Sequence, residues 1–322
     1  MQLKRLGRTG LKVTEICMGT MTFGNQAPEE TAHAILDRAL EAGVNFIDTA
    51  DIYPIPGAVK TAGRTEEVIG RWLKGKRHSV VLATKCGARV GPGPNDEGSS
   101  RQHILDAIDA SLRRLQTDYV DLYQIHWPDT QTPLEETVLA LHDLVRWGKV
   151  RYVGCSNFEG WRLCKALWIS DRLALSRFES VQPQYNLLSR GIERELLPLC
   201  AEESVGVMTY SPLAGGLLSG KYSREQPPPE GTRFALDRPT GPLYRERYWH
   251  DRLFDAVERA QELAQSCGVT SVQLAIAWLL QQPLTSVILG ATRLEHLEEA
   301  LKGLDVKLDA ATIEALDALA PP

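Results

Sequence analysis

Short apolar runs alternate with amphipathic segments along most of this chain. Eight of these runs have the composition of buried strands, and they lie at 16–19, 45–49, 80–84, 120–125, 150–154, 180–183, 205–209 and 286–289. The segments between them carry apolar residues at helical spacing, as where Ile104, Ile108 and Leu112 share one face. The predicted helices lie at 28–41, 64–74, 100–116, 133–147, from 159 onward, near 191–203, 251–267, 271–281, 293–302 and 309–319.

This alternation favours a parallel sheet, because parallel neighbours need crossover connections. A doubly wound sheet is the alternative, but it often begins with a glycine-rich turn, and no Gly-x-Gly-x-x-Gly occurs. Residues 2–15 predict a hairpin, and the Gly/Pro-rich segment 214–248 predicts a long loop. The expected fold is α/β: a (β/α)8 TIM barrel with an N-terminal β-hairpin and extra C-terminal helices, in a single domain over residues 1–322.

Titratable side chains stand at the ends of three successive predicted strands. They are Asp48, Lys85 and His126, and Tyr53 lies just beyond the first strand. A polar residue at one strand end is ordinary, because strand ends meet solvent. Four such groups at the same edge are better explained by a site, since barrels of this kind carry their active sites at the C-terminal ends of the strands.

The composition limits the kinds of molecule that we expect this protein to bind. The net charge of −5 is mild and its charges are interspersed, so we expect no nucleic-acid partner. The six cysteines are scattered without metal-ligand spacing, which predicts buried or semi-buried free thiols, a reducing compartment and no metal site. No apolar leader or membrane-spanning run occurs. We therefore expect a cytoplasmic protein without a membrane partner; nothing in the pattern indicates its oligomeric state.

Two other motifs in the sequence suggest different functions. The segment 215–222 nearly matches a phosphate-binding P-loop, but Tyr222 stands where a magnesium-binding Ser or Thr belongs. Asp48 with Glu66 or Glu67 suggests the carboxylate pair of a glycosidase. Because both glutamates lie in a helical pattern, we expect them to be solvated. Neither motif is favoured.

Seven segments together resemble the aldo-keto reductase superfamily over nearly the whole chain. They are 46–50 with Tyr53, 65–70, 83–85, 118–126, 148–158, 182–186 and 210–213. The insertion at 51–54 is similar to the Tas-like and potassium-channel-β-subunit-like branch. Each segment is a weak signal alone, but their order along the chain is specific.

The resemblance implies a catalytic set of Asp48, Tyr53, Lys85 and His126. Reduction of a carbonyl by hydride leaves an alkoxide, and the phenol of Tyr53 is suited to protonate it. A free phenol has a pKa near about 10, and a charged Lys85 would lower the pKa of Tyr53. Asp48 would hold Lys85 in its charged form, while His126 would orient the carbonyl oxygen. The implied reaction is NADP(H)-dependent reduction of small-molecule aldehydes or ketones.

The resemblance also implies a nicotinamide cofactor extended across the barrel mouth. The residues carried over to it are Thr20, Gln26, Asp48, Ser156, Asn157, Gln182, Tyr210, Ser211, Leu213, Gly215, Lys221, Arg233, Gly290, Thr292, Arg293, His296 and Glu299. Thr292 and Arg293 would lie near a 2′-phosphate, which favours NADP(H). His296 and Ala300 depart from the residues common in this branch, so NAD(H) stays possible.

Two questions stay open at the level of sequence. The loops around the mouth offer Phe23, Arg89, Trp127, Tyr244 and Trp249, a mixture suited to aromatic, apolar or anionic carbonyl compounds. It selects no single aldehyde or ketone. The alternative function is a cofactor-binding regulatory protein, similar to channel β subunits, whose turnover is incidental.

Overall fold

A closed barrel of parallel strands forms the centre of the computed structural model, which describes residues 1–237 and 239–320. The strands are β3 (Ile16–Gly19), β4 (Phe46–Asp48), β5 (Val81–Cys86), β6 (Val120–Ile125), β7 (Val150–Ser156), β8 (Phe178–Gln182), β9 (Gly206–Thr209) and β10 (Ser286–Gly290). They pair in chain order, and β10 pairs with β3 to close the ring. A hairpin of β1 (Leu3–Arg5) and β2 (Lys12–Thr14) precedes the barrel. The predicted fold class is confirmed.

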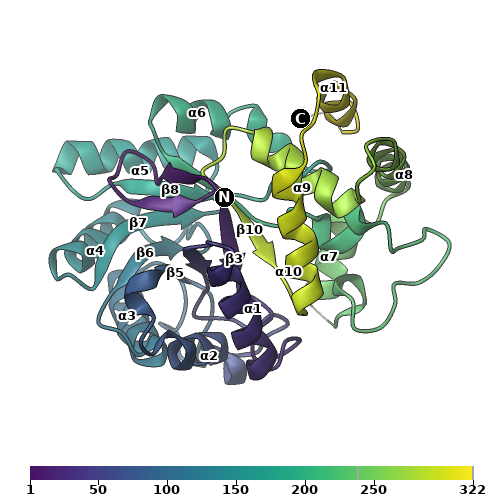
Figure 1. Ribbon diagram of the computed structural model, residues 1–322. Coiled ribbons are helices and arrows are strands. Elements are labelled where there is room, and N and C mark those ends of the chain that lie inside the picture. Colours follow the sequence, from purple (N-terminus) through teal and green to yellow (C-terminus); the bar gives the residue numbers. More distant parts are fainter. Residues whose placement is uncertain (238, 321–322) are drawn as a thin grey trace.

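Helices surround this ring of strands (Figure 1). They are α1 (Glu29–Glu41), α2 (Arg64–Leu73), α3 (Arg101–Leu115), α4 (Leu134–Arg146), α5 (Gly160–Leu173), α6 (Leu196–Glu202), α7 (Thr240–Tyr248), α8 (Asp251–Ser266), α9 (Ser271–Gln281), α10 (Leu294–Leu301) and α11 (Ala310–Asp317). No single helix of the described chain is long and apolar enough to span a membrane; α8 and α9 meet the length and composition test as a pair, bent by 92°.

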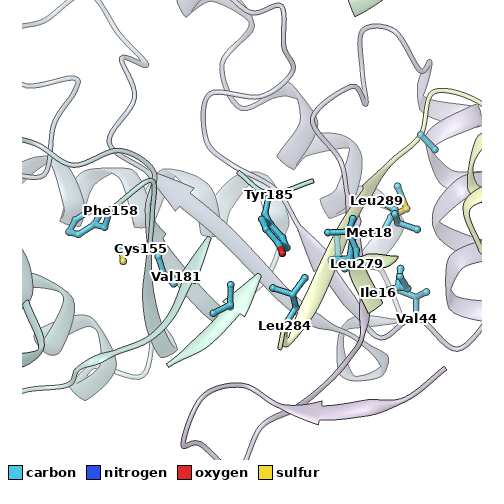
Figure 2. Close-up of a cluster of buried hydrophobic side chains, with 14 of the residues drawn as sticks. Ile16, Met18, Val44, Cys155, Phe158, Val181, Tyr185, Leu279, Leu284 and Leu289 are labelled. Atoms are coloured by element: carbon cyan, nitrogen blue, oxygen red, sulfur yellow. The ribbon is translucent and has the colours of Figure 1, made fainter. Parts of the chain in front are cut away.

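Strand periodicity divides the core into two parts. Side chains that point outward pack against the helices in one large cluster, and Figure 2 shows members of it from β3, β7 and β10, including Met18, Cys155 and Leu289. A smaller cluster fills the barrel interior with inward side chains such as Phe46, and Leu6 and Val13 of the hairpin region join it. Successive strand residues face opposite sides. The hairpin therefore packs against the interior cluster.

Two predicted segments differ from the structure. The helix predicted near 191–203 is a 3-10 helix, η3 (Gly191–Glu193), followed by α6. Pro198 explains the break, because proline lacks an N–H and is tolerated only in a helix's first turn. The loop predicted for 214–248 contains η4 (Ala214–Ser219), η5 (Arg233–Ala235) and α7. The Gly and Pro residues of this segment, two of them in the first turn of α7, predicted a loop where the structure has that helix. Position 238 lies outside the described residues, as do 321 and 322.

The cysteines are free thiols, as expected, but their burial is not uniform. Cys164 and Cys267 are exposed, whereas the other four are buried. The prediction of buried or semi-buried thiols was wrong for these two because each lies on the solvent side of a surface helix or at its end.

Gly154 lets β7 approach β8 closely. A Cβ atom at this position would lie 2.4 Å from Ser180 Oγ and 2.9 Å from the Ser180 carbonyl oxygen. Ser180 is fully buried in β8, next to Val181 and two residues before Gln182. The glycine thus sets the spacing of the two strands immediately below the polar end of the barrel.

Gly154→Ala is expected to destabilise the protein by roughly 1–3 kcal/mol, the usual cost of overpacking. The free energy of unfolding from urea denaturation measures this. Gly10→Ala serves as the matched control, because a Cβ there meets nothing within 4 Å, and its effect should stay within about 0.5 kcal/mol. Equal stability of the two variants would contradict the close approach of β7 and β8.

Candidate active site

The inward positions of the barrel change from apolar to polar toward the C-terminal ends of the strands. Phe46 is followed on the same face by Asp48, Ala83 by Lys85, and Leu122 by Gln124. Asp48 and Lys85 are 2% and 0% exposed, so an ion pair lies inside the barrel. The two-residue period of the strands produces this polar layer directly.

Every oxygen of the Asp48 carboxylate is engaged. Oδ2 accepts a hydrogen bond from Lys85 Nζ at 2.5 Å. Oδ1 accepts from Gln182 Nε2 at 2.9 Å and from Gln124 Nε2 at 3.1 Å. Lys85 Nζ also donates to the Thr49 carbonyl oxygen at 3.0 Å. A buried charge pair is tolerated only when its remaining hydrogen-bonding capacity is satisfied, and this pair meets that condition.

Lys85 is held as a cation although it is buried. Burial alone favours the neutral amine, but the Asp48 carboxylate and the nearby Tyr53 raise the pKa of Lys85 above its ordinary value. The Lys85 ammonium lies 5.1 Å from the centre of the Tyr53 ring. A fixed positive charge therefore stands beside the phenol, as predicted.

The phenol of Tyr53 is 8% exposed, at the mouth side of this pair. Burial raises its pKa, and the Lys85 charge, which favours the phenolate, offsets this only in part. Lys85 lowers the pKa of Tyr53 as predicted, but the net pKa still lies above the ordinary value, because desolvation of the phenolate outweighs the attraction. Tyr53 is a protonated hydrogen-bond donor at neutral pH.

His126 faces Tyr53, with ring centres 5.7 Å apart and the rings near perpendicular. Burial, and secondly the Lys85 charge, lower the pKa of His126 well below its ordinary value, so the imidazole is neutral. Its Nδ1 is buried, and no described residue hydrogen-bonds either ring nitrogen. Trp127, which is 44% exposed, stacks on its other side. A polar ring without a protein partner at this place is available to a ligand.

Next to the polar layer lies a hydrogen-bonded shelf from the ends of β7, β8 and β9. The Ser156 hydroxyl donates to the Gln182 carbonyl oxygen at 2.8 Å. Asn157, at φ +61°, donates to the His126 carbonyl oxygen and accepts from the Tyr210 hydroxyl at 2.8 Å. The shelf therefore presents amide and aromatic groups beside His126.

Three cations gather at the other end of the mouth. Lys221, Arg233 and Arg293 are close enough that burial and then the two guanidinium charges lower the pKa of Lys221. Arg233 Nη1 is buried without a hydrogen-bond partner, and no carboxylate in the described parts of the chain pairs with any of the three. Uncompensated charges of one sign destabilise a fold unless a ligand neutralises them. An anion such as a phosphate group fits this cluster.

The remaining predicted cofactor residues lie around the same mouth with different partners. Thr20 donates to the Asp48 carbonyl oxygen, and Gln26 reaches the Gly231 carbonyl at 3.4 Å while its Oε1 is buried and unpaired. Glu299 accepts hydrogen bonds from Gln273 of α9 and from Thr270, the residue that precedes this helix. Its carboxylate is thus already occupied.

Residues of the loop after β9 and of the last strand complete the set. Ser211 has φ +57° and its hydroxyl lies 3.5 Å from that of Tyr244, while Leu213 is half-buried. Gly215 has φ +69°, and a Cβ there would lie 2.6 Å from the Tyr244 ring. Gly290, Thr292 and His296 lie at and after the end of β10, next to Arg293.

Several expectations about neighbouring side chains are corrected. Glu66 is fully buried, not solvated, because it accepts hydrogen bonds from Thr84 at 2.6 Å and Arg114 at 2.7 Å. Phe23 is fully buried, so its side chain is not exposed at the mouth. Arg89 is paired with Glu97, so its charge is compensated within the loop.

Sequence reasoning missed two contributors to the site. Gln124 holds Asp48, and its position two residues before His126 on the same strand face was a usable signal. Tyr248 of α7 accepts hydrogen bonds from Gln184 at 2.7 Å and Asn186 at 3.0 Å, which fix this helix over the strand ends. No pattern in the sequence indicated helix α7.

Comparison with known proteins agrees with this geometry. The family model described as "Aldo/keto reductase family" matches residues 15–321. The chain belongs to the aldo/keto reductase family.

Full-length relatives of this aldo/keto reductase come from both groups that the resemblance named. It is 39% identical to the "Uncharacterized oxidoreductase YrpG" of Bacillus subtilis, over 100% of this chain and 96% of that protein. It is 40% identical to a "Probable voltage-gated potassium channel subunit beta" of Arabidopsis thaliana, over 95% and 92%. It is 34% identical to "Protein tas" of Escherichia coli, over 99% and 97%. The predicted family and branch are confirmed.

Lys85→Met is expected to destabilise this aldo/keto reductase by about 3–5 kcal/mol, because it leaves the Asp48 carboxylate buried without its cation. Urea denaturation gives the free energy of unfolding. The double variant Asp48→Asn/Lys85→Met removes both charges and should recover part of the loss. A Lys85→Met variant as stable as the wild type would contradict a charged pair in the barrel.

Proposed function

We propose that the protein is an NADP(H)-dependent reductase of aldehydes or ketones. The observation that carries this proposal is the layer in which a satisfied Asp48–Lys85 pair lies beside a protonated Tyr53, across from a neutral, unpartnered His126. The bound nicotinamide supplies the hydride. Each protein group then has one task that its surroundings suit it to perform.

Tyr53 is the proton donor in this reaction. An alkoxide forming within hydrogen-bond reach of its hydroxyl takes the phenolic proton, and the Lys85 ammonium stabilises the phenolate that remains. Asp48 keeps Lys85 charged and in place through the bond at 2.5 Å. The neutral His126 has an N–H to donate to the carbonyl oxygen, which orients that oxygen toward Tyr53.

The chain also offers suitable groups for the cofactor. Ser156, Asn157 and Gln182 present amide and hydroxyl groups for a carboxamide, and the ring of Tyr210 lies beside them. The uncompensated cluster of Lys221, Arg233 and Arg293 suits the phosphate groups. Three cations exceed what a pyrophosphate alone requires, and this favours the additional 2′-phosphate of NADP(H).

The second candidate is a cofactor-binding regulatory protein. The observation favouring it is the 40% identity to a protein named as a probable potassium channel β subunit. The complete set of Asp48, Lys85, Tyr53 and His126 supports the enzyme instead, since a sensor that binds cofactor does not need a proton donor. Steady-state turnover with simple aldehydes separates the two proposals.

Tyr53→Phe is expected to lower turnover by roughly 10²–10⁴, the usual contribution of a general acid, while leaving cofactor affinity within about twofold. Loss of NADPH absorbance with a panel of aldehydes measures the rate. Tyr119→Phe, at the opposite end of β6 from His126, is the matched control and should be as active as the wild type. Wild-type turnover by the Tyr53 variant would remove this residue from its role.

Arg293→Ala is expected to weaken NADPH binding while barely affecting NADH. A guanidinium–phosphate contact at an exposed position is worth roughly 1.5–3 kcal/mol at most, so the preference should fall on the order of tenfold to a hundredfold. Fluorescence quenching titrations with both cofactors decide this. Arg38→Ala is the control, because Arg38 of α1 pairs with Glu298 of α10 and its charge is therefore compensated within the protein. Equal weakening of both cofactors would mean that Arg293 only supports the loop.

A further inference from the structure

The imidazole of His296 bridges two residues of the segment that enters α10. Its Nδ1 lies 3.2 Å from Thr292 Oγ1, and its Nε2 lies 2.9 Å from Arg293 Nη2. All three side chains are on the cationic side of the mouth, and the His296 side chain is exposed. The ring therefore holds Arg293, an exposed member of the cationic cluster, in position.

The chemistry of these two contacts fixes the protonation of the ring. A guanidinium has only donors, so Nε2 must offer its lone pair to Arg293. The proton of the neutral ring then stands on Nδ1 and is donated to Thr292 Oγ1. His296 is consequently uncharged while it holds Arg293, and it cannot keep this contact as an imidazolium.

The charges around the ring act in the same direction. Partial desolvation of the ring lowers the pKa of His296, and the charges of Arg293 on its own segment and of Lys221 from the loop after η4 lower it further; Glu295 opposes them. Arg233 adds to the positive potential at Lys221. On the sides where α1 and α9 pack against α10, Glu298 is held by Arg38, and Glu299 by Thr270.

We propose that His296 is a specificity-determining residue of the cofactor site, which takes up a proton when a 2′-phosphate binds and then contacts that phosphate as an imidazolium. This inference rests on the proposed function, because it assigns a role within the same cofactor site. A dianionic phosphate among Lys221, Arg293 and His296 replaces Arg293 as the partner of Nε2. It also cancels the repulsion that keeps the ring neutral.

The sign of the resulting pH dependence follows from linkage. The bound state holds the His296 proton more tightly than the free state, so its pKa is higher with NADPH than without. The extra affinity for NADPH is then fully present below the free pKa and is lost as pH rises through the bound pKa. NADH has no 2′-phosphate and lacks this component. Because a phosphate monoester has its own second pKa near about 6, the useful range begins at roughly pH 6.5.

The test compares dissociation constants for NADPH and NADH at about pH 6.5 and pH 8.5, by fluorescence quenching at constant ionic strength. The wild-type preference for NADPH should fall by roughly threefold to tenfold between these pH values, since one linked proton changes the constant at most tenfold per pH unit. Calorimetry in two buffers of different ionisation enthalpy should show net proton uptake with NADPH and none with NADH.

Two variants separate the proton from the contact. His296→Gln keeps an acceptor for Arg293 but does not titrate, so its cofactor preference should be the same at both pH values. His296→Arg carries a permanent charge, and its preference for NADPH should be high and independent of pH. Far-ultraviolet circular dichroism of each variant checks that the fold is retained.

The outcomes are distinguishable. A wild-type preference for NADPH that does not change with pH, or a His296→Gln variant that keeps the wild-type pH dependence, overturns the role of His296 and leaves the proposed function standing. Equal affinity of the wild type for NADPH and NADH overturns the NADP(H) assignment together with this inference. Failure to bind either cofactor overturns the proposed function itself.

Discussion

An ion pair sealed inside the barrel is the constraint on which the rest of the site depends. Removing Asp48 and Lys85 from water is costly, and their attraction compensates only if every remaining lone pair and proton has a partner. Gln124, Gln182 and the Thr49 carbonyl supply those partners. The inward-facing groups at the strand ends therefore keep Lys85 in its charged form.

The need to satisfy this ion pair explains why the barrel interior is apolar at one end and polar at the other. Phe46 and Leu122 belong to an interior cluster that the N-terminal hairpin joins, whereas the next inward residues of the same strands are the polar Asp48 and Gln124. Water is kept from the lower face of the ion pair. Tyr53 and His126 stand at its upper face, where both side chains are nearly buried and His126 Nδ1 has no hydrogen-bond partner.

The two ends of the mouth differ in how their charges are balanced. The Asp48 carboxylate and the Lys85 ammonium are satisfied by protein groups, so this pair is in place before any ligand arrives. Around Lys221, Arg233 and Arg293 positive charges oppose one another without a carboxylate. The cationic cluster can therefore gain binding energy from an anionic ligand, whereas the geometry around Asp48 is fixed without one. An extended anionic cofactor would contact both regions.

The sequence by itself determined the barrel and the edge that carries the candidate active site. Alternating apolar strands and amphipathic helices depend on local periodicity, and residues such as Asp48, Lys85 and His126 stand at fixed positions on successive strands. Local pattern was sufficient there because parallel strands that pair in chain order bring their ends to one edge.

Tertiary structure alone decided the remaining features. The direction in which the pKa of Tyr53 is shifted depends on how completely the phenol is desolvated. The burial of Glu66 depends on Arg114 from another helix. Helix α7 has no periodic signal, because it is held by Tyr248 against the strand ends and not by its own propensity. The link between His296 and Arg293 is local, but its consequence comes from Lys221, some seventy positions away along the chain. Such effects arise from sums of burial and charge over elements that only the fold brings together.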